Sequence, residues 1–134
     1  ASAEVEYEGY GKWTRVQEIM EFARKIQAHK IGIANCIGLI HEARIFARIL
    51  RVNGFEVYSV ICKVAGKAKS SIGIPKSCES IGAAMCNPIL QARLLNEAQT
   101  DLNVVIGLCV GHDSLFYKYS EAYTTTLITI NFFN

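Results

Sequence analysis

The run NVVIGLCV, residues 103–110, is the feature that most restricts how this chain can fold. After Asn103 it is apolar without alternating polar positions, and polar residues lie on both sides of this apolar part. A strand of this kind is typical of the middle of a parallel sheet that is covered on both faces. The run therefore predicts a central strand with helices on both sides.

The rest of the chain alternates between helical and strand patterns. Apolar residues recur at helical spacing from Trp13 to Ile26 and from Gly38 to Asn53, and Asn87-Pro88 is a strong helix start for a third helix that runs to about Gln99. A short helix through Tyr119, with Asp113 as its cap, is also expected. Strands are predicted at KIGIANC (30–36), FEVYSVIC (55–62), NVVIGLCV (103–110) and TTTLITI (124–130), the last at an edge.

This order predicts a single α/β domain over residues 1–134, since helices between strands imply a mainly parallel sheet. We expect three layers and four or five strands, in a flavodoxin-like or Rossmann-like arrangement. Residues 63–86 show no sustained period and predict a long loop, with one short strand at SSIGIP (70–75).

Composition excludes several function classes. A formal net charge of +2 does not indicate a nucleic-acid-binding protein, and a cluster of lysines in 63–76 is read as a solvated loop or as counter-charge for an anionic group. No apolar run is long enough to cross a bilayer, and the start ASAEVEYEGYGKW lacks the features of a signal peptide. We therefore expect a cytoplasmic protein with no membrane partner.

Five cysteines are the main candidates for chemistry. An odd number in a chain without a secretion signal argues against a disulfide framework and favours metal binding or thiol chemistry. Any single cysteine is more often a small buried residue than a ligand, so position has to decide between the two. The five are Cys36, Cys62, Cys78, Cys86 and Cys109.

Four of these cysteines fall at the ends of predicted elements. Cys36, Cys62 and Cys109 close three strands, and Cys86 precedes the helix that begins at Asn87. In a parallel α/β sheet the carboxyl ends of strands and the starts of the following helices share one edge, where such folds bind their ligands. We therefore expect these four thiols to converge there, with Cys78 of the long loop as a further ligand.

The chemistry of this predicted site favours an iron–sulfur cluster over zinc. Closed zinc sites usually show paired spacing such as CxxC, which this chain lacks, whereas clusters tolerate scattered thiolates. Gly111, His112 and Asp113 follow Cys109 directly and are the other candidate cofactor-binding residues. A redox role with a redox partner protein would follow from a cluster at an open edge.

Two other functions stay open from the sequence. One is a thiol enzyme with Cys109 as nucleophile, His112 as base and Asp113 as the orienting group. The other is a module that binds an anionic small molecule, in which VGHDS (110–114) forms a small anion site at a helix start. The usual phosphate-binding glycine motifs do not occur.

Two motifs also carry a family resemblance, MCNPILQARLLN (85–96) and GLCVGHDSLFYKYSEA (107–122). From about Trp13 to Leu127 the sequence resembles a family of small, uncharacterised, cysteine-containing proteins of archaea and anaerobic bacteria that are regarded as metal-binding. The resemblance implies metal binding without a known reaction, and its cysteine-bearing segments correspond to those of all five cysteines. Members of that family commonly carry a further cysteine-containing stretch at the N-terminus and tend to continue past the last strand with a basic, histidine-containing tail, whereas this chain begins ASAEVEYEGY and ends TINFFN. If those regions supply ligands, we expect the site in this chain to be incomplete.

Overall fold

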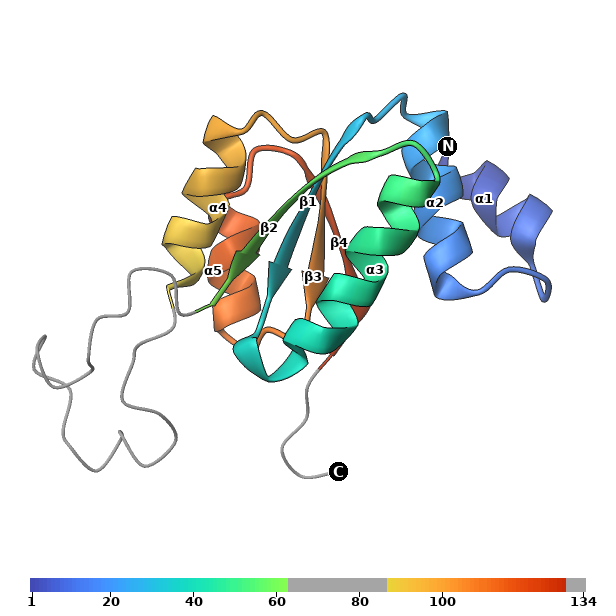
Figure 1. Cartoon of the computed structure of the whole chain (residues 1–134). Helices are drawn as coiled ribbons and strands as arrows, with labels where there is room; N and C mark the ends of the chain where they lie inside the picture. The colour runs from blue at the N-terminus through green and yellow to red at the C-terminus, as the bar shows by residue number, and fades with distance from the viewer. Residues whose placement is uncertain (63–86, 130–134) are drawn as a thin grey trace, which may run out of the picture.

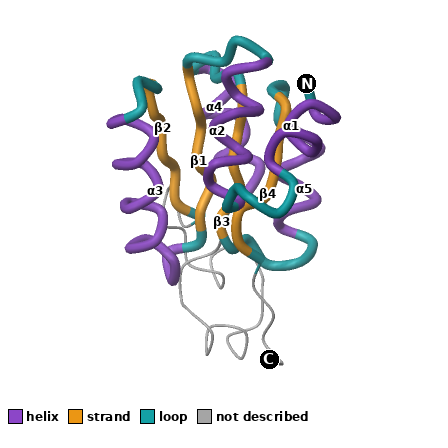
Figure 2. Tube along the Cα trace, turned by 90° about the vertical axis from the view of Figure 1, so that its right-hand side faces the viewer, coloured by secondary structure: helices purple, strands orange, loops and turns teal. Residues whose placement is uncertain are grey.

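Four parallel strands form one sheet in the computed structural model, which describes residues 1–62 and 87–129. The strands are β1 (Lys30–Asn35), β2 (Glu56–Ile61), β3 (Leu102–Ile106) and β4 (Tyr123–Ile128). Their order is β2-β1-β3-β4, every neighbouring pair is parallel, and Figure 2 shows them side by side. This is a flavodoxin-like arrangement, so the predicted α/β class is confirmed, with four strands in the described part of the chain.

Helices cover both faces of this sheet (Figure 1). The helices α2 (Arg15–Lys25) and α3 (Ile40–Val52) lie on one face, and α4 (Pro88–Glu97) and α5 (His112–Tyr119) lie on the other. A short 3₁₀ turn, η1 (Ile37–Leu39), leads into α3, and an N-terminal helix α1 (Ser2–Gly9) packs on α2. No helix in the described ranges is long and apolar enough to cross a bilayer.

Alternate residues of the two central strands form a separate core on each face. Ile31, Ile33 and Val104 are fully buried against α2 and α3. On the other face Ala34 and Val105 are buried against α4 and α5. Because both faces of β3 are buried, the interpretation of the apolar run as a central, doubly covered strand is confirmed.

A glycine in β1 lets α4 approach the sheet closely. A Cβ atom at Gly32 would stand 2.2 Å from Oδ1 of Asn103 and 2.8 Å from Cδ1 of Leu95. The buried Asn103 amide fills this space, accepts a hydrogen bond from the hydroxyl of Thr100 and donates one to that of Ser120. The small residue at position 32 thus sets the spacing between α4 and the two central strands.

The Asn87-Pro88 helix start is confirmed. The side chain of Asn87 accepts a hydrogen bond from the amide of Leu90 at 3.0 Å, and Pro88 is the first residue of α4. Both residues therefore act as the capping pattern predicts, because the asparagine satisfies an amide that the helix leaves unpaired and the proline lacks one.

Two predicted boundaries were wrong, and one element was missed. Strand β3 ends at Ile106 instead of residue 110, because the chain turns at Gly107 with a φ of 71°. The residue that caps α5 is Gly111, with a φ of 92°, instead of Asp113. Helix α1 was not predicted, since its segment shows little amphipathic character. The predicted loop 63–86 and its short strand 70–75 lie outside the described residues.

Candidate thiol site at the carboxyl edge of the sheet

Two cysteines directly continue the hydrogen-bonded ladder of the sheet. Cys36 follows β1, and its amide donates to the carbonyl of Ile106 at 3.1 Å. Cys62 follows β2, and its amide donates to the carbonyl of Asn35 at 2.8 Å. The ladder therefore fixes the backbone of both cysteines at the carboxyl edge, towards which the arrowheads of the strands point in Figure 1.

Cys109 lies at the same edge, three residues beyond the end of β3. The prediction that it closes the strand was wrong, because Gly107 ends the strand and Cys109 stands in the loop that leads to α5. The amide of Asp113 donates to the carbonyl of Cys109 at 3.0 Å, so this loop is joined to the first turn of the helix.

Cys36 and Cys109 flank the point at which the strand order reverses. After β1 the chain enters α3 on one face, and after β3 it enters α5 on the opposite face (Figure 1). In open parallel sheets this divergence opens a crevice outside the carboxyl ends of the two central strands, where ligands bind. The two cysteines thus occupy the position at which this fold class places its ligands.

The three described thiols differ in their surroundings. Cys62 is only 2% exposed and packs in the apolar cluster that includes Ala92 and Phe116. Its sulfur accepts a hydrogen bond from the amide of Ile37 at 3.4 Å, which links it to the turn that follows Cys36. Cys36 and Cys109 are half-buried. Cys62 therefore also serves as a core residue, whereas the other two are accessible in part.

Burial raises the pKa of the Cys109 thiol above its ordinary value, and the neighbouring Cys36 and the carboxylate of Asp113 raise the pKa further. A raised pKa keeps the thiol protonated at neutral pH, so a metal has to displace that proton in order to bind.

The predicted convergence is visible in part. Cys36, Cys62 and Cys109 all lie at the carboxyl edge, but among residues 1–62 and 87–129 no group of three or more His, Cys, Asp or Glu side chains is arranged to hold one metal ion. Cys78 and Cys86 lie outside the described residues. The amide of Asn87, the residue after Cys86, donates to the carbonyl of Cys62 at 2.6 Å, so the start of α4 is joined to this edge.

The Gly111–Asp113 segment forms the start of α5. The carboxylate of Asp113 accepts hydrogen bonds from the amides of Gly111, at 3.1 Å, and Ser114, at 2.7 Å. It therefore satisfies backbone groups at the helix start instead of orienting His112, and it occupies amides that an anionic ligand would need. This geometry does not support the catalytic relay or the anion site that the sequence left open.

Two buried amide side chains at this edge were not predicted. Gln91 of α4 is fully buried, and its Nε2 donates to the carbonyl of Val60 at 2.9 Å and of Asn35 at 3.4 Å. Asn35 is 1% exposed and donates to the carbonyl of Cys36 at 3.0 Å. The only signal in the sequence was a glutamine among the apolar residues of α4. Both amides hold the strand ends that carry Cys36 and Cys62.

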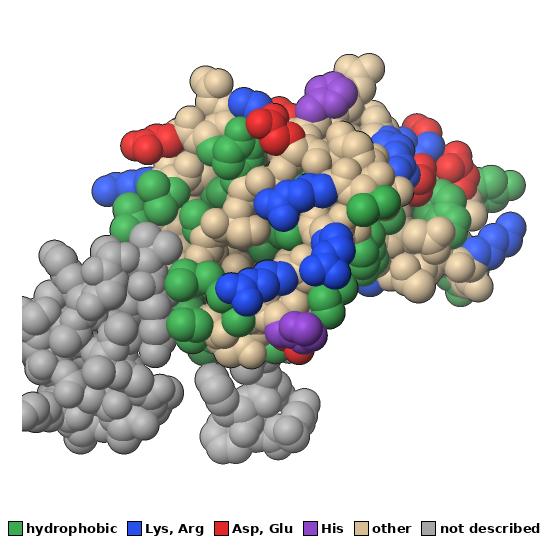
Figure 3. Space-filling model, viewed as in Figure 1, with side chains coloured by type: hydrophobic (Ala, Val, Ile, Leu, Met, Phe, Trp, Pro, Cys, Tyr) green, Lys and Arg blue, Asp and Glu red, His purple; other side chains and the backbone are tan. Residues whose placement is uncertain are grey.

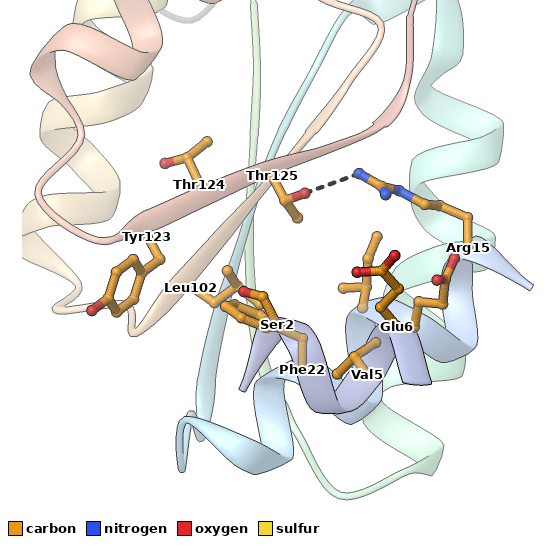
Figure 4. Close-up of a pocket in the computed structure, with 11 residues that line it drawn as sticks. Ser2, Val5, Glu6, Arg15, Phe22, Leu102, Tyr123, Thr124 and Thr125 are labelled. Atoms are coloured by element: carbon orange, nitrogen blue, oxygen red, sulfur yellow. Dashed lines mark hydrogen bonds between the residues drawn. The ribbon is translucent and has the colours of Figure 1, made fainter. Parts of the chain in front are cut away.

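A cavity of about 330 Å³ lies at the opposite edge of the sheet, between α1, α2 and β4 (Figure 4). Leu102 and Tyr123, the first residues of β3 and β4, are part of its lining. Arg15 donates to the carbonyl of Thr126 at 2.9 Å and to the hydroxyl of Thr125 at 3.1 Å, and so ties α2 to the edge strand. This cavity is separate from the cysteines.

Comparisons with known proteins show what this chain is similar to. The model of a family described as "Protein of unknown function (DUF1847)" matches residues 1–127. The "Uncharacterized protein MJ0455" of the archaeon Methanocaldococcus jannaschii is 54% identical over 127 residues, which are 95% of this chain and 65% of that protein. The chain thus spans just under two thirds of the length of this relative. No solved structure matches the chain.

Proposed function

We propose that this chain, which belongs to the DUF1847 family of proteins of unknown function, binds a metal centre through cysteine thiolates at the carboxyl edge of its sheet. The observation that supports the proposal is that Cys36, Cys62 and Cys109, from three distant segments, share this edge. Cysteines that act only as buried apolar residues would not be expected to gather at the edge where this fold class binds ligands.

An iron–sulfur cluster suits this donor set better than a single zinc ion. Thiolate ligands select soft metals and clusters, and the chain lacks the paired CxxC spacing of closed zinc sites. The amide of Ile37 already donates to the sulfur of Cys62. Hydrogen bonds of this kind tune the potential of clusters. Cys78 and Cys86 complete the proposed ligand set, and a cluster here would exchange electrons with a redox partner protein.

The raised pKa of Cys109 predicts how the affinity for a metal should depend on pH. Because the thiol has to lose its proton when it binds a metal, the affinity should increase with pH until Cys109 is ionised without the metal. Metal binding should therefore release protons at neutral pH, which a weakly buffered titration with a pH indicator measures.

The direct test is the metal content of the whole chain, purified without oxygen and also reconstituted with iron and sulfide. We expect about two or four iron atoms per chain, an equal amount of sulfide, and charge-transfer absorption in the visible range. Bound zinc in place of iron and sulfide would support a thiolate metal site but would refute the iron–sulfur cluster. Less than about a tenth of an equivalent of any metal after both preparations would refute the proposal.

Single substitutions identify the ligands. Cys36→Ser and Cys109→Ser should each remove most of the bound metal, whereas Val110→Ser should retain it, since Val110 is 91% exposed in the same loop and carries no sulfur. Circular dichroism checks that each variant is folded. Full metal content in both cysteine variants would exclude these two residues as ligands.

A further inference from the structure

A groove runs between helix α3 and strand β2, on the face of the sheet opposite α4 and α5. It encloses about 460 Å³, and its lining includes Ala43, Ala47, Ser59 and Ile61. The same groove is bordered by the side chains of Arg44, Arg48 and Arg51 from α3. Apolar and small side chains thus form the floor of the groove, and basic side chains form one of its borders.

The three arginines form one stripe on the helix. Arg44, Arg48 and Arg51 are spaced by four and three residues, which places them on the same side of α3 over about 10 Å of its length. Figure 3 shows basic side chains gathered over the middle of this face. In the described part of the chain, no ion pair or hydrogen bond joins the side chain of any of the three to another residue.

In the part of the chain that the structure describes, strand β2 is an edge strand of the sheet and lies beside this stripe. Within residues 1–62 and 87–129, β2 pairs only with β1, and the amides of Glu56 and Cys62 donate to the β1 side. Since successive residues of a strand direct their backbone groups to opposite sides, the amides and carbonyls of Val57, Ser59 and Ile61 face outwards. The side chains of Ser59 and Ile61 line the groove itself.

We propose that an extended acidic segment of a partner protein docks here by adding a strand to the outer edge of β2. Its backbone would pair with the outward groups of Val57, Ser59 and Ile61. Its alternate side chains are about 7 Å apart on one face, so two or three carboxylates would reach the 10 Å arginine stripe. Backbone pairing supplies affinity, and the arginines select acidic side chains.

Other occupants fit this groove less well. In antiparallel pairing with β2 of a second copy, the two-fold axis would bring the arginine stripes of both copies to the same face, where they repel. Proteins that bind single-stranded nucleic acid usually stack its bases on aromatic side chains, and none of the described residues that line the groove is aromatic. The segment 63–86 of this chain carries four lysines and one glutamate, so its charge has the same sign as the stripe.

The groove also leads to the thiol edge. Asn35 and Ile61, which line it, directly precede Cys36 and Cys62. A docked segment would therefore end beside those two cysteines and bring its partner protein close to them. The docking itself does not depend on a metal centre, so it can be tested whether or not the protein binds one.

The test is a binding titration of the whole chain with a fluorescent seven-residue peptide in which glutamate and valine alternate. The groove variant carries Arg44→Gln, Arg48→Gln and Arg51→Gln. The matched control carries Lys12→Gln, Arg93→Gln and Lys118→Gln, which remove the same charge from exposed positions elsewhere. Two further peptides replace glutamate by lysine or place proline at the centre.

We expect the groove variant to bind the acidic peptide at least about tenfold more weakly, as the loss of three exposed charge pairs predicts, and the control to stay within about threefold. The lysine and proline peptides should bind poorly. Hydrogen exchange at the amides of Val57, Ser59 and Ile61 should slow when the acidic peptide binds, which a contact with the arginines alone would not produce.

Three results would overturn the proposal. Equal weakening in both protein variants would show that only net charge matters. Unchanged exchange at the three β2 amides would exclude strand addition. Binding of a single-stranded oligothymidylate that depends on the arginines, without binding of the peptide, would assign the groove to nucleic acid.

Discussion

Substitution of Gly32 by alanine should destabilise the fold strongly, although it adds only one methyl group. The added Cβ would stand 2.2 Å from Oδ1 of Asn103 and 2.8 Å from Cδ1 of Leu95. Leu95 can adjust its side chain, but Asn103 is fully buried and bonded to Thr100 at 2.7 Å and to Ser120 at 2.8 Å.

The expected magnitude combines two effects. Overpacking a tight core site costs about 1–3 kcal/mol. Displacing the Asn103 amide from its partners costs about 1–3 kcal/mol more, because the buried group then lacks hydrogen bonds. The free energy of unfolding should therefore fall by about 2–6 kcal/mol, a large share of the 5–15 kcal/mol that is typical of globular domains.

Urea denaturation followed by far-ultraviolet circular dichroism measures this loss. Gly38→Ala is the matched control, since its Cβ would meet only Sγ of Cys36, at an ordinary 3.8 Å, and should cost less than about 1 kcal/mol. In an Asn103→Ala background the cost of Gly32→Ala should fall below about 1.5 kcal/mol, because the clashing amide is gone. A wild-type-like Gly32→Ala protein, or an undiminished cost in that background, would refute the reasoning.

Three further outcomes are expected. Phe116→Ala should lower the free energy of unfolding by about 3–5 kcal/mol, since Phe116 is fully buried, whereas Leu115→Ala, at 39% exposure, should cost less than about 1 kcal/mol; equal losses in urea denaturation would contradict this. Asp101 accepts hydrogen bonds at 2.9 Å from two backbone amides at the start of β1, which lower the pKa of its carboxyl group. Its stabilising effect is therefore present above the unfolded pKa of about 4 and lost as the pH falls below it. Asp101→Ala should cost about 1 kcal/mol at pH 7, and the gap to wild type should close towards pH 2; a gap that does not depend on pH would argue against the charge. Alkylation of Cys109 by iodoacetamide, followed by peptide mass spectrometry, should reach half its maximal rate above pH 8.5, the usual thiol value, because the pKa is raised; a midpoint near pH 7 would instead indicate an activated nucleophile.

Much of the fold could be predicted because the apolar pattern of each element is strong. The apolar run at 103–110 indicated a doubly covered central strand, and the structure buries every residue of β3. The helix start at Asn87 was predictable because the physics of capping is local to a few residues. Helix α1 was missed because its sequence shows almost no amphipathic pattern. Its contacts with α2 stabilise it instead.

For the candidate site, the sequence predicted only that the thiols lie at the carboxyl edge of the sheet. Cysteines at the ends of strands indicated where the thiols would gather, since parallel strands end together. The prediction that Cys109 closes the strand was wrong, because the chain turns at Gly107 and the strand ends before it. A glycine inside an apolar run does not interrupt the apolar pattern, so nothing in that pattern indicated this turn. Gln91 and Asn35 were missed, because a buried amide is recognisable only once its hydrogen-bond partners from other strands are known.

The hydrogen-bonded ladder that runs through Cys36 and Cys62 has a consequence for how such proteins can change over time. Successive residues on a strand face opposite sides of the sheet, so inserting or deleting one residue in β1 or β2 would reverse the direction in which the following sulfur points. Strands β1 and β2 should therefore tolerate substitutions far better than the insertion or deletion of a single residue. Additions to the chain are best accommodated in the connections between elements, where they leave the alternation intact.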